Sequence, residues 1–278
     1  MELREILIFI GVCILSYLLG GISIARFITK KNNGGIENQG SGNPGTMNML
    51  RNHGIFMGLF TLLCDALKGV IPALFGLLYF GQFDVQLSYF ALYAFGFSAV
   101  VGHIFPVYYK FKGGKGIATT FGVFMVADPI STVILFGILF LVLYLIKIGS
   151  VVSLLMIIIN AVIQLFRDCM ENNWGAIVCM WIMVILDIYA HRTNLTRLID
   201  NKENPADLQE GLEKDIEKIK NKRERKLEKN AEKQEKIEQK YNNKITKKSN
   251  KVQKKIDKIN EKNSVEEKTF SEETAEDK

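Results

Sequence analysis

Long apolar blocks alternate with short polar joints along the first two hundred residues, and this pattern predicts a bundle of membrane helices. Seven apolar blocks can be distinguished, at residues 6–27, 55–80, 87–107, 117–126, 130–146, 151–166 and 174–190. A spanning helix needs about 20 apolar residues, with about 17 as the lower limit. The first three blocks exceed this limit and the last comes close, whereas the fourth to sixth are short enough to be half-spans. We expect an all-α, polytopic integral membrane protein with seven transmembrane helices.

The joints between the blocks differ in charge, which predicts the orientation of the chain. With seven spans, alternate joints lie on opposite sides of the membrane. One set of short joints holds eight Lys and Arg residues and the other set holds two. Because cytoplasmic loops carry the excess of basic residues, we expect the N-terminus outside and the C-terminus in the cytoplasm.

The composition changes abruptly after residue 203. Of the 35 Lys and Arg residues, 21 lie in the last 75 positions, where Lys and Glu alternate with sparse apolar residues. We expect residues 1–203 to form the membrane-embedded domain and 204–278 a solvated cytoplasmic tail, disordered or partly helical. The Lys-rich part at 240–258 offers contacts to anionic lipid or nucleic acid. Solvation is the favoured interpretation, and we expect no nucleic-acid partner.

The four cysteines predict neither a metal site nor a disulfide framework. Cys13, Cys64, Cys169 and Cys179 lie in or beside apolar blocks, and no C-x-x-C spacing occurs. Buried, unreactive thiols are the expected outcome.

Three joints on the expected cytoplasmic side are richer in polar residues than ordinary loops. They read "GSGNPGTMNMLRNHG" at 40–54, "GHIFPVYYKFKGGKGIATTFG" at 102–122 and "AHRTNLTRLIDNKE" at 190–203. Each contains one of the three histidines of the chain, at His53, His103 and His191. The joints on the other side lack this pattern, so we expect the three to form one site.

The second joint combines glycines with lysines in a way that suits a phosphate. Without a Cβ, successive backbone N–H groups can turn toward one anion, and Lys112 and Lys115 supply positive charge. The apolar run after Gly116 adds a helix N-terminus with unpaired N–H donors. The loop is not a Walker A motif, because Lys115 is followed by glycine and not by Ser or Thr. A glycine-hinged basic anchor at the membrane surface is the alternative interpretation.

The other two joints supply further groups for an anion. In the first, Arg51 offers a planar fork that suits phosphate. In the third, His191 and Asn194 share a helix face. The alternatives are an interfacial turn for the first joint and a basic stop sequence for the third. Within the second block, Asp65 and Lys68 are three residues apart, and we expect a structural ion pair there.

The three joints together resemble the motifs of the bacterial acyl-phosphate:glycerol-3-phosphate acyltransferase family. "GSGNPGTMNMLR" is similar to its first motif, "DALKG" to its second-helix signature, "GHIFPVYYKFKGGKGIAT" to its second motif and "HRTNLTRLIDNKE" to its third. Two positions depart from the pattern: Met47 replaces the usual threonine, and Asn201 replaces the usual glycine.

The resemblance implies transfer of a fatty acyl group from acyl phosphate to the 1-hydroxyl of glycerol 3-phosphate, which yields lysophosphatidic acid and phosphate at the start of phospholipid synthesis. It also implies a seven-helix plasma-membrane enzyme without a metal or other cofactor. The expected partners are the two substrates, membrane lipids and the upstream enzyme that forms acyl phosphate.

The roles expected from the residues and the resemblance fall into two groups. The residues expected to act in catalysis are Ser41, Arg51, His191 and Asn194. The residues expected to bind substrate are Asn43, Gly45, Asn48, His103, Lys112, Gly113, Gly114, Lys115, Gly116, Arg192 and Arg197. Ser41 acts either as a covalent nucleophile or as a hydrogen-bond donor.

Since an acyl phosphate is already activated, we expect direct transfer, with catalysis by positioning and charge stabilisation. The rival hypothesis is a transporter for a phosphorylated solute. Transporters place their sites near the midplane of repeated halves, and this chain shows no internal repeat. A lipid-binding scaffold is a weaker third hypothesis.

Overall fold

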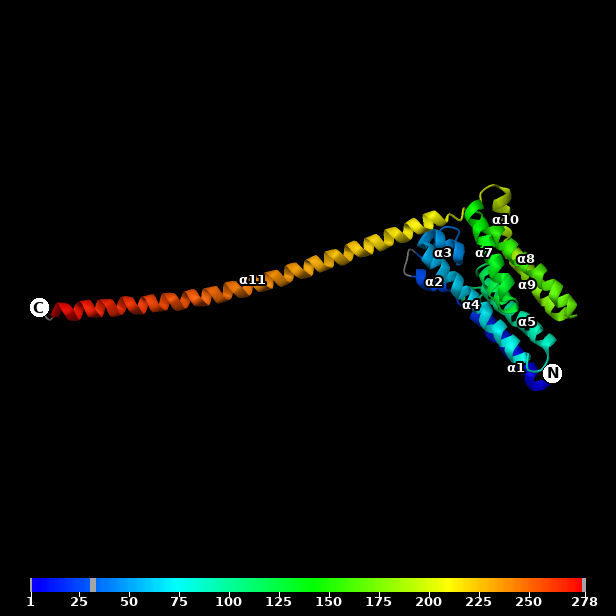
Figure 1. Cartoon of the computed structure of the whole chain (residues 1–278), viewed down its shortest axis with the longest axis horizontal. Helices are drawn as coiled ribbons and strands as arrows, with labels where there is room; N and C mark the ends of the chain where they lie inside the picture. The colour runs from blue at the N-terminus through cyan, green and yellow to red at the C-terminus, as the bar shows by residue number, and fades with distance from the viewer. Residues whose placement is uncertain (1, 31–33, 277–278) are drawn as a thin grey trace. The chain divides into compact units, whose positions relative to one another are not determined.

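The computed structural model describes residues 2–30 and 34–276, with side chains up to residue 258. Within these ranges every regular element is a helix (Figure 1). Lys31, one of the eight basic residues in the charge count, lies outside the described residues. The elements are α1 (Leu3–Gly20), α2 (Ile24–Thr29), η1 (Ile36–Asn38), α3 (Thr46–His53), α4 (Ile55–Phe80), α5 (Val85–Ile104), η2 (Val107–Tyr109), α6 (Ile117–Ala127), α7 (Pro129–Ile146), α8 (Gly149–Met170), α9 (Trp174–Ala190), α10 (Arg192–Ile199) and α11 (Leu208–Glu276).

Helices α4 and α5 form the centre of the bundle, with α6 packed on α4 and with α1 and α9 packed on α5. The approach of α6 to α4 depends on glycines. A Cβ atom on Gly69 would lie 2.0 Å from the carbonyl oxygen of Thr119, and one on Gly122 would lie 2.0 Å from that of Ala66. Small residues let membrane helices pack backbone against backbone. This contact fixes α6 and therefore the loop that precedes it.

Five stretches of the described chain are long and apolar enough to cross a membrane. They are Leu3–Thr29, Ile55–Phe80, Val85–Tyr109, Pro129–Ile146 and Gly149–Met170. A sixth is obtained if α9 and α10, which are bent by 50° relative to each other, count as one span. The structure therefore describes an all-helical membrane protein with five or six full-length spans, and the expected count of seven stays a prediction.

The short apolar blocks have different outcomes in the structure. The blocks at 130–146 and 151–166 lie in α7 and α8, which are 18 and 22 residues long, so the half-span interpretation is wrong for both. The block at 117–126 forms α6, which has only 11 residues. At 1.5 Å per residue this helix is about 16 Å long, roughly half of the hydrocarbon core.

Polar side chains from neighbouring helices satisfy the C-terminal end of α6. The Arg167 guanidinium donates to the carbonyl oxygen of Ala127 at 2.8 Å, and the carbonyl oxygen of Phe124 accepts from the Asp128 N–H at 2.9 Å, with Thr132 Oγ1 at 3.2 Å from it. Arg167 is itself paired with Asp168 Oδ1 at 2.9 Å. A backbone carbonyl without a partner in an apolar environment costs several kcal/mol. These bonds explain how a helix this short can end inside the bundle.

The helices carrying the polar joints lie at one end of the bundle. In Figure 1, α2, α3 and α10 lie at the end opposite to the N-terminus. The loop at 110–116 is at this same end, because the Lys115 ammonium donates to Asn194 Oδ1 on α10. The chain thus brings its three polar joints together, as expected from their pattern.

Residues after 203 do not all behave as a separate tail. The chain divides into two compact units, 1–216 and 217–278. The first unit therefore continues 13 residues beyond the boundary expected at residue 203 (216 minus 203). Residues 208–276 form one helix, α11, where the composition predicts a disordered or partly helical tail. The side chains of residues 217–258 are all exposed.

Candidate active site

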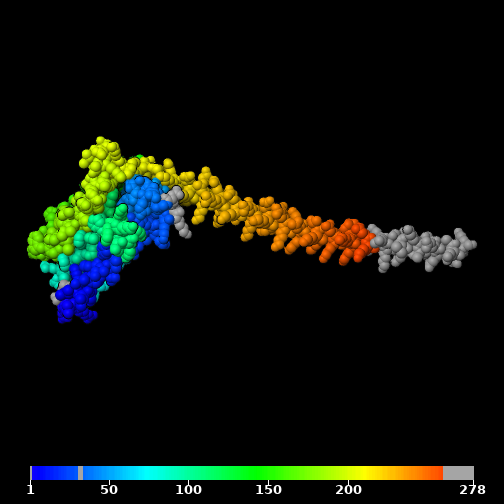
Figure 2. Space-filling model, turned by 180° about the vertical axis from the view of Figure 1, so that it is seen from behind, coloured from blue at the N-terminus to red at the C-terminus, as the bar shows by residue number. Residues whose placement is uncertain are grey.

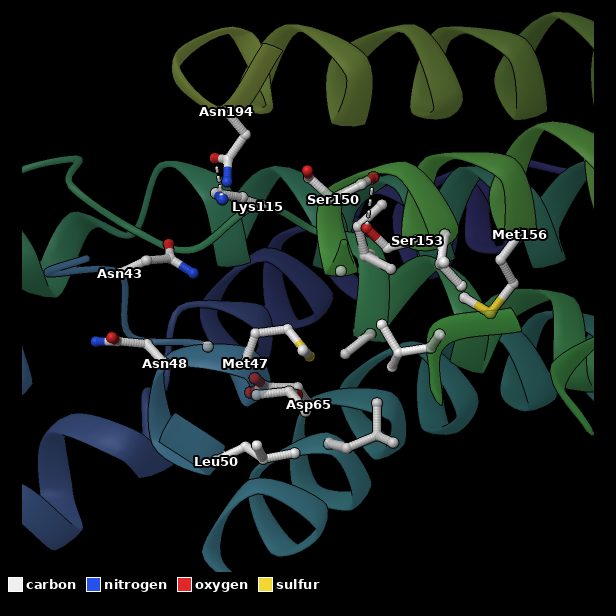
Figure 3. Close-up of a pocket in the computed structure, with 18 of the residues that line it drawn as sticks. Asn43, Met47, Asn48, Leu50, Asp65, Lys115, Ser150, Ser153, Met156 and Asn194 are labelled. Carbon is white, nitrogen blue, oxygen red and sulfur yellow. Dashed lines mark hydrogen bonds between the residues drawn. The ribbon is translucent and has the colours of Figure 1, made fainter. Parts of the chain in front are cut away.

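A cavity lies where the three polar joints meet, and it continues between apolar helix faces. Its empty volume is about 1230 Å³, including the space at its open mouth. Residues from the segment 41–51, from α4, α6, α7 and α8, and from the segment 191–208 line it. Figure 3 shows Asn43, Asn48, Lys115 and Asn194 at one end and Met156 toward the other. The cavity therefore combines a polar head with an apolar extension.

The loop that ends at Lys115 is held in an unusual backbone conformation. Lys110, Phe111 and Gly116 have φ values of 52°, 60° and 87°. A Cβ atom at Gly113 would lie 2.0 Å from the carbonyl oxygen of His103. The Gly114 N–H donates to this same carbonyl at 3.0 Å. The glycines thus allow the loop to fold back onto the end of α5.

Arg26 fixes the outer side of this loop. Its guanidinium donates to the carbonyl oxygen of Lys112 at 2.6 Å, forms an ion pair with Glu37 and stacks on the ring of Tyr109 with a centroid distance of 4.2 Å. The side chain of Lys112 is exposed and does not line the cavity. The backbone carbonyl of Lys112 therefore fixes the loop, and binding of a phosphate by its ammonium stays a prediction.

Lys115 is the cation that the loop directs into the cavity. Its ammonium donates to Asn194 Oδ1, and Asn194 Nδ2 donates to Glu203 Oε1 at 2.7 Å. The pKa of Lys115 is lowered to about 8, mainly by burial and also by the positive charges of Arg51 and Arg197, while the negative charge of Glu203 opposes these effects. The site therefore holds a lysine whose charged form is disfavoured by burial.

His191 lies buried at the junction of α9 and α10, and its ring orientation is set by the backbone. Its Nδ1 atom is 2.8 Å from the carbonyl oxygen of Asp187. A donating Nδ1–H at this position would leave Nε2 as a proton acceptor. The Asp187 carboxylate accepts a hydrogen bond from Thr120 Oγ1 at 2.6 Å. A Cβ atom at Gly116 would overlap Asp187 Oδ1, so the start of α6 and the end of α9 are tightly fitted.

Asn48 organises the first joint. Its Oδ1 atom accepts from the Ser41 N–H at 3.0 Å and from Asn52 Nδ2 at 3.0 Å, and its Nδ2 donates to the carbonyl oxygen of Gln39 at 3.0 Å. Gly40 and Gly42 have φ values of 54° and 72°. This buried amide therefore holds the Ser41 loop against α3.

Arg51 has partners that the sequence did not suggest. Its Nε and Nη2 atoms donate to the carbonyl oxygens of Pro205 and Asn204, at 2.6 and 2.7 Å. Burial lowers the pKa of its guanidinium, with Glu203 opposing this effect. A guanidinium has five N–H donors, so Arg51 retains three for a ligand in the cavity that it lines.

The expected pair on α4 is present at the base of the polar head. Lys68 Nζ donates to Asp65 Oδ1 at 2.6 Å, and both side chains are buried. His103 Nδ1 lies 3.9 Å from the same Asp65 oxygen. Asp65 and His103 also line the cavity. The Asp65–Lys68 ion pair therefore borders the site in addition to linking one turn of α4.

The cavity contains ten of the fifteen residues expected to act on substrate. All four expected in catalysis line it, and so do Asn43, Gly45, Asn48, His103, Lys115 and Gly116. The other five do not, and these are Lys112, Gly113, Gly114, Arg192 and Arg197. Arg192 points away and stacks on the ring of Tyr189 at 4.4 Å. Spacing alone could not distinguish these residues, because all of them sit within the same joints.

Several lining residues have no role in the sequence interpretation. They include Thr46, Met47, Ser150, Ser153 and Glu203. Among the described residues, Thr46 Oγ1, Ser150 Oγ and Glu203 Oε2 are buried atoms without a hydrogen-bond partner. Polar atoms in this state usually bind water or a ligand. Glu203 could have been suspected, because it ends the third motif, whereas Ser150 has no local signal.

Comparison with known proteins gives a consistent result. A family model described as glycerol-3-phosphate acyltransferase matches residues 10–201. A glycerol-3-phosphate acyltransferase of Finegoldia magna is 37% identical over 190 residues, covering 66% of this chain and 87% of the relative. One of Endomicrobium trichonymphae is 35% identical over 196 residues, covering 69% of this chain and 92% of the relative.

Solved structures show the same similarity. Two crystal structures of PlsY (YgiH), described as an integral membrane glycerol 3-phosphate acyltransferase, are each 31% identical to this chain. The glycerol 3-phosphate form has a TM-score of 0.63 and covers 71% of this chain and 94% of its own. The lysophosphatidic acid form has a TM-score of 0.62 and covers 73% and 98%.

Proposed function

Because the chain belongs to the glycerol-3-phosphate acyltransferase family, we propose that its cavity binds glycerol 3-phosphate together with an acyl phosphate donor. The chain is an integral membrane acyltransferase that acylates glycerol 3-phosphate for phospholipid synthesis. The observation that carries the proposed donor is the shape of the cavity, whose basic polar head continues into an apolar extension. A phosphate attached to a fatty acyl chain matches both parts. Family membership displaces the transporter hypothesis.

The apolar extension suits the fatty acyl chain. It is lined by Leu59 and Leu62 on α4 and by Phe136, Leu139 and Phe140 on α7. Leu59 and Phe140 are 46% and 45% exposed, so the wall is open to the surrounding lipid. An apolar ligand gains about 25 cal/mol per Å² of surface removed from water. A donor can therefore enter from the membrane with its chain already in an apolar medium.

The polar head offers separate groups for the two substrates. Lys115, with the N–H groups of the first turn of α6, binds the phosphate of glycerol 3-phosphate. Arg51, Ser41 and Asn43 bind the phosphate of the donor. Gly113 and Gly114 act on the acceptor by shaping the loop. Ser150 Oγ and Glu203 Oε2 are buried and have no hydrogen-bond partner, so they are available to bind either substrate.

The reaction in this scheme is direct acyl transfer. The 1-hydroxyl oxygen of glycerol 3-phosphate attacks the carbonyl carbon of the acyl phosphate, and the C–O bond to phosphate breaks. His191 Nε2 accepts the hydroxyl proton or orients it, with Asn194 in support. Phosphate leaves with the bonding electron pair, and Arg51 stabilises its charge. No covalent acyl-enzyme is needed, so Ser41 serves as a hydrogen-bond donor.

The same proposal includes the orientation of the enzyme. The chain crosses the plasma membrane seven times, with α6 as a short crossing, and the cavity faces the cytoplasm. Support comes from the eight-to-two excess of basic residues in the joints at the cavity end. Support also comes from the position of the N-terminus at the opposite end of the bundle (Figure 1).

The donor is tested with purified enzyme in lipid nanodiscs. Palmitoyl phosphate or palmitoyl-coenzyme A is supplied with radiolabelled glycerol 3-phosphate, and labelled lysophosphatidic acid is measured. We expect product from palmitoyl phosphate and none from the coenzyme A ester. Turnover with the coenzyme A ester at a comparable rate would refute the proposed donor.

A further inference from the structure

A short segment beyond the family match borders the candidate active site. The family model ends at residue 201, and the second compact unit begins at residue 217. Between them, residues 204–216, here called the strap, belong to the compact membrane unit. In the space-filling view, the yellow residues after 200 lie directly against the blue residues of α3 (Figure 2). The strap is therefore a feature that the matched region of the family does not include.

The beginning of the strap is fixed at two places. The carbonyl oxygens of Asn204 and Pro205 accept hydrogen bonds from the Arg51 guanidinium at 2.7 and 2.6 Å. The next residue, Ala206, is fully buried, and its N–H donates to the carbonyl oxygen of Lys147 at 2.7 Å. The strap thus connects α3 with the turn between α7 and α8.

The end of the strap is fixed at the start of α4. Asp215 is 5% exposed, and its Oδ2 atom accepts from the Phe56 N–H at 3.0 Å. A carboxylate is stabilised at a helix N-terminus by the unpaired N–H groups and the helix dipole. Lys214 Nζ donates to the carbonyl oxygen of Arg51. The buried Asp215 and the half-buried Lys214, each bonded to the membrane unit, distinguish the strap from the exposed helix that follows.

The strap also contributes directly to the cavity wall. Leu208 lines the cavity beside Arg51. A Cβ atom at Gly211 would lie 3.1 Å from Ile55 Cγ1, so the first turn of α11 packs on the start of α4. The strap therefore borders the cavity beside Arg51 of α3.

We propose that the strap is a fixed wall of the acyltransferase site that orients Arg51 toward the acyl donor. A guanidinium is planar, so two bonds from Nε and Nη2 to carbonyls fix the plane of the whole fork. The remaining N–H groups are then held in one direction for a phosphate. This inference rests on the donor-binding role proposed for Arg51.

A variant of the full chain that displaces the strap tests the inference. Ala206→Leu adds bulk where a Cβ at Gly149 would already lie 3.5 Å from the Ala206 Cβ, so the start of the strap must move. Ala231→Leu, on the exposed part of α11, is the matched control. We expect Ala206→Leu to lower kcat/KM for acyl phosphate about tenfold, the loss of one charge-assisted contact, with KM for glycerol 3-phosphate nearly unchanged. Ala231→Leu should match the wild type.

A double-mutant cycle separates positioning of Arg51 from general damage. In an Arg51→Ala background, Ala206→Leu should cause no further loss of kcat/KM, because the group that the strap orients is gone. Equal losses in both backgrounds would overturn the inference, as would a wild-type kcat/KM in Ala206→Leu. If Arg51→Ala alone retains the wild-type kcat/KM, the donor-binding role proposed for Arg51 is refuted. This single variant does not involve the strap, so the cycle distinguishes failure of the proposed function from failure of the inference.

A cross-link keeps the test decisive if Ala206→Leu does not fold. Cysteines at Gly211 and Ile55 bring two Cβ atoms near the separation of about 3.5–4.5 Å that a disulfide needs. A fixed wall predicts that the oxidised protein retains its activity, with each single-cysteine variant as control. Loss of activity on oxidation and recovery on reduction would show instead that the strap must open, which would overturn the inference.

Discussion

At the scale of single residues, Lys115 determines the pH dependence expected of the site. Its pKa is lowered to about 8 by burial, so its ammonium is present below that pH and lost as the pH rises through it. The phosphate of glycerol 3-phosphate has a second pKa of about 6 and stays doubly charged over this range. Binding therefore weakens only because the enzyme loses its positive charge.

We expect kcat/KM for glycerol 3-phosphate to fall about tenfold for each pH unit above 8, as one unprotonated group requires. In Lys115→Arg the guanidinium stays charged over this range, so the fall should disappear even though the absolute value is lower. Steady-state assays at pH 7, 8, 9 and 9.5 measure this. A flat wild-type profile would show that Lys115 does not bind the substrate phosphate.

The glycines of the loop give a second residue-scale prediction. Gly113→Ala places a Cβ against the carbonyl oxygen of His103, a backbone atom that cannot move aside, so the loop must shift. We expect KM for glycerol 3-phosphate to rise about tenfold or more, with little change for the acyl donor. Gly137→Ala on α7 is the control, because nothing lies within 4 Å of its Cβ. Equal kinetic constants in Gly113→Ala and Gly137→Ala would favour the alternative interpretation, in which the loop is a glycine-hinged basic anchor at the membrane surface.

At the scale of elements, α6 is the helix whose presence depends most on its neighbours. Its 11 residues begin beside the cavity, and its last carbonyl, that of Ala127, is satisfied by Arg167 from α8. Gly69 and Gly122 bring α4 and α6 into backbone contact, and this packing, more than the bonds at the C-terminal end of α6, holds the loop that carries Lys115. The site therefore depends on a helix that would be marginal on its own.

Arg167→Met should destabilise the protein while leaving the chemistry intact. It removes the bond to the carbonyl oxygen of Ala127 and leaves Asp168 without its ion-pair partner. We expect a loss of about 1–3 kcal/mol, seen as a melting temperature lower by several degrees. The kcat/KM measured well below that temperature should stay near the wild-type value, because Arg167 does not line the cavity. Arg4→Ala, an exposed arginine, is the control, and an equal melting temperature in both variants would contradict the anchoring role.

At the scale of the whole molecule, orientation in the membrane is the property that most needs measurement. The cavity end carries the basic joints, and the opposite end carries Cys169, which is exposed at the end of α8. If the cavity is cytoplasmic, an impermeant thiol reagent should reach Cys169 from outside intact cells. Lys112 is exposed on the loop at the cavity end.

The labelling experiment compares the native chain with a Cys169→Ser, Lys112→Cys variant. The native chain should be labelled in intact cells, and the variant only after the membrane is opened. The Cys169→Ser single variant measures the background from the other three thiols. Labelling of Lys112→Cys from outside would reverse the proposed orientation and place the site on the opposite face.

Local patterns in the sequence were sufficient to predict the helices and the joints. An apolar block is a signal contained within about 20 residues, and a helix satisfies its own backbone in lipid, so each block predicted a helix without knowledge of its neighbours. The glycines and lysines at 112–116 and the polar residues at 41–51 and 191–194 likewise marked the joints that form the site. Membership of the family was also recognisable from those motifs, and the comparisons confirm it.

Tertiary structure decided which residues of each joint enter the cavity. Lys115 lines the cavity, whereas Lys112 is exposed and does not line it, and the carbonyl oxygen of Lys112 accepts a hydrogen bond from Arg26. Arg51 is bonded to Pro205, 154 residues away, and Asp215 lies at the start of α4. Contacts across such distances leave no local pattern, because they depend on how whole helices pack and not on the order of neighbouring residues. The sequence by itself therefore determined the membrane helices, the joints and the chemistry available at one end, and only the packed bundle decided that Asn204 and Pro205 contact Arg51 and that Leu208 lines the cavity.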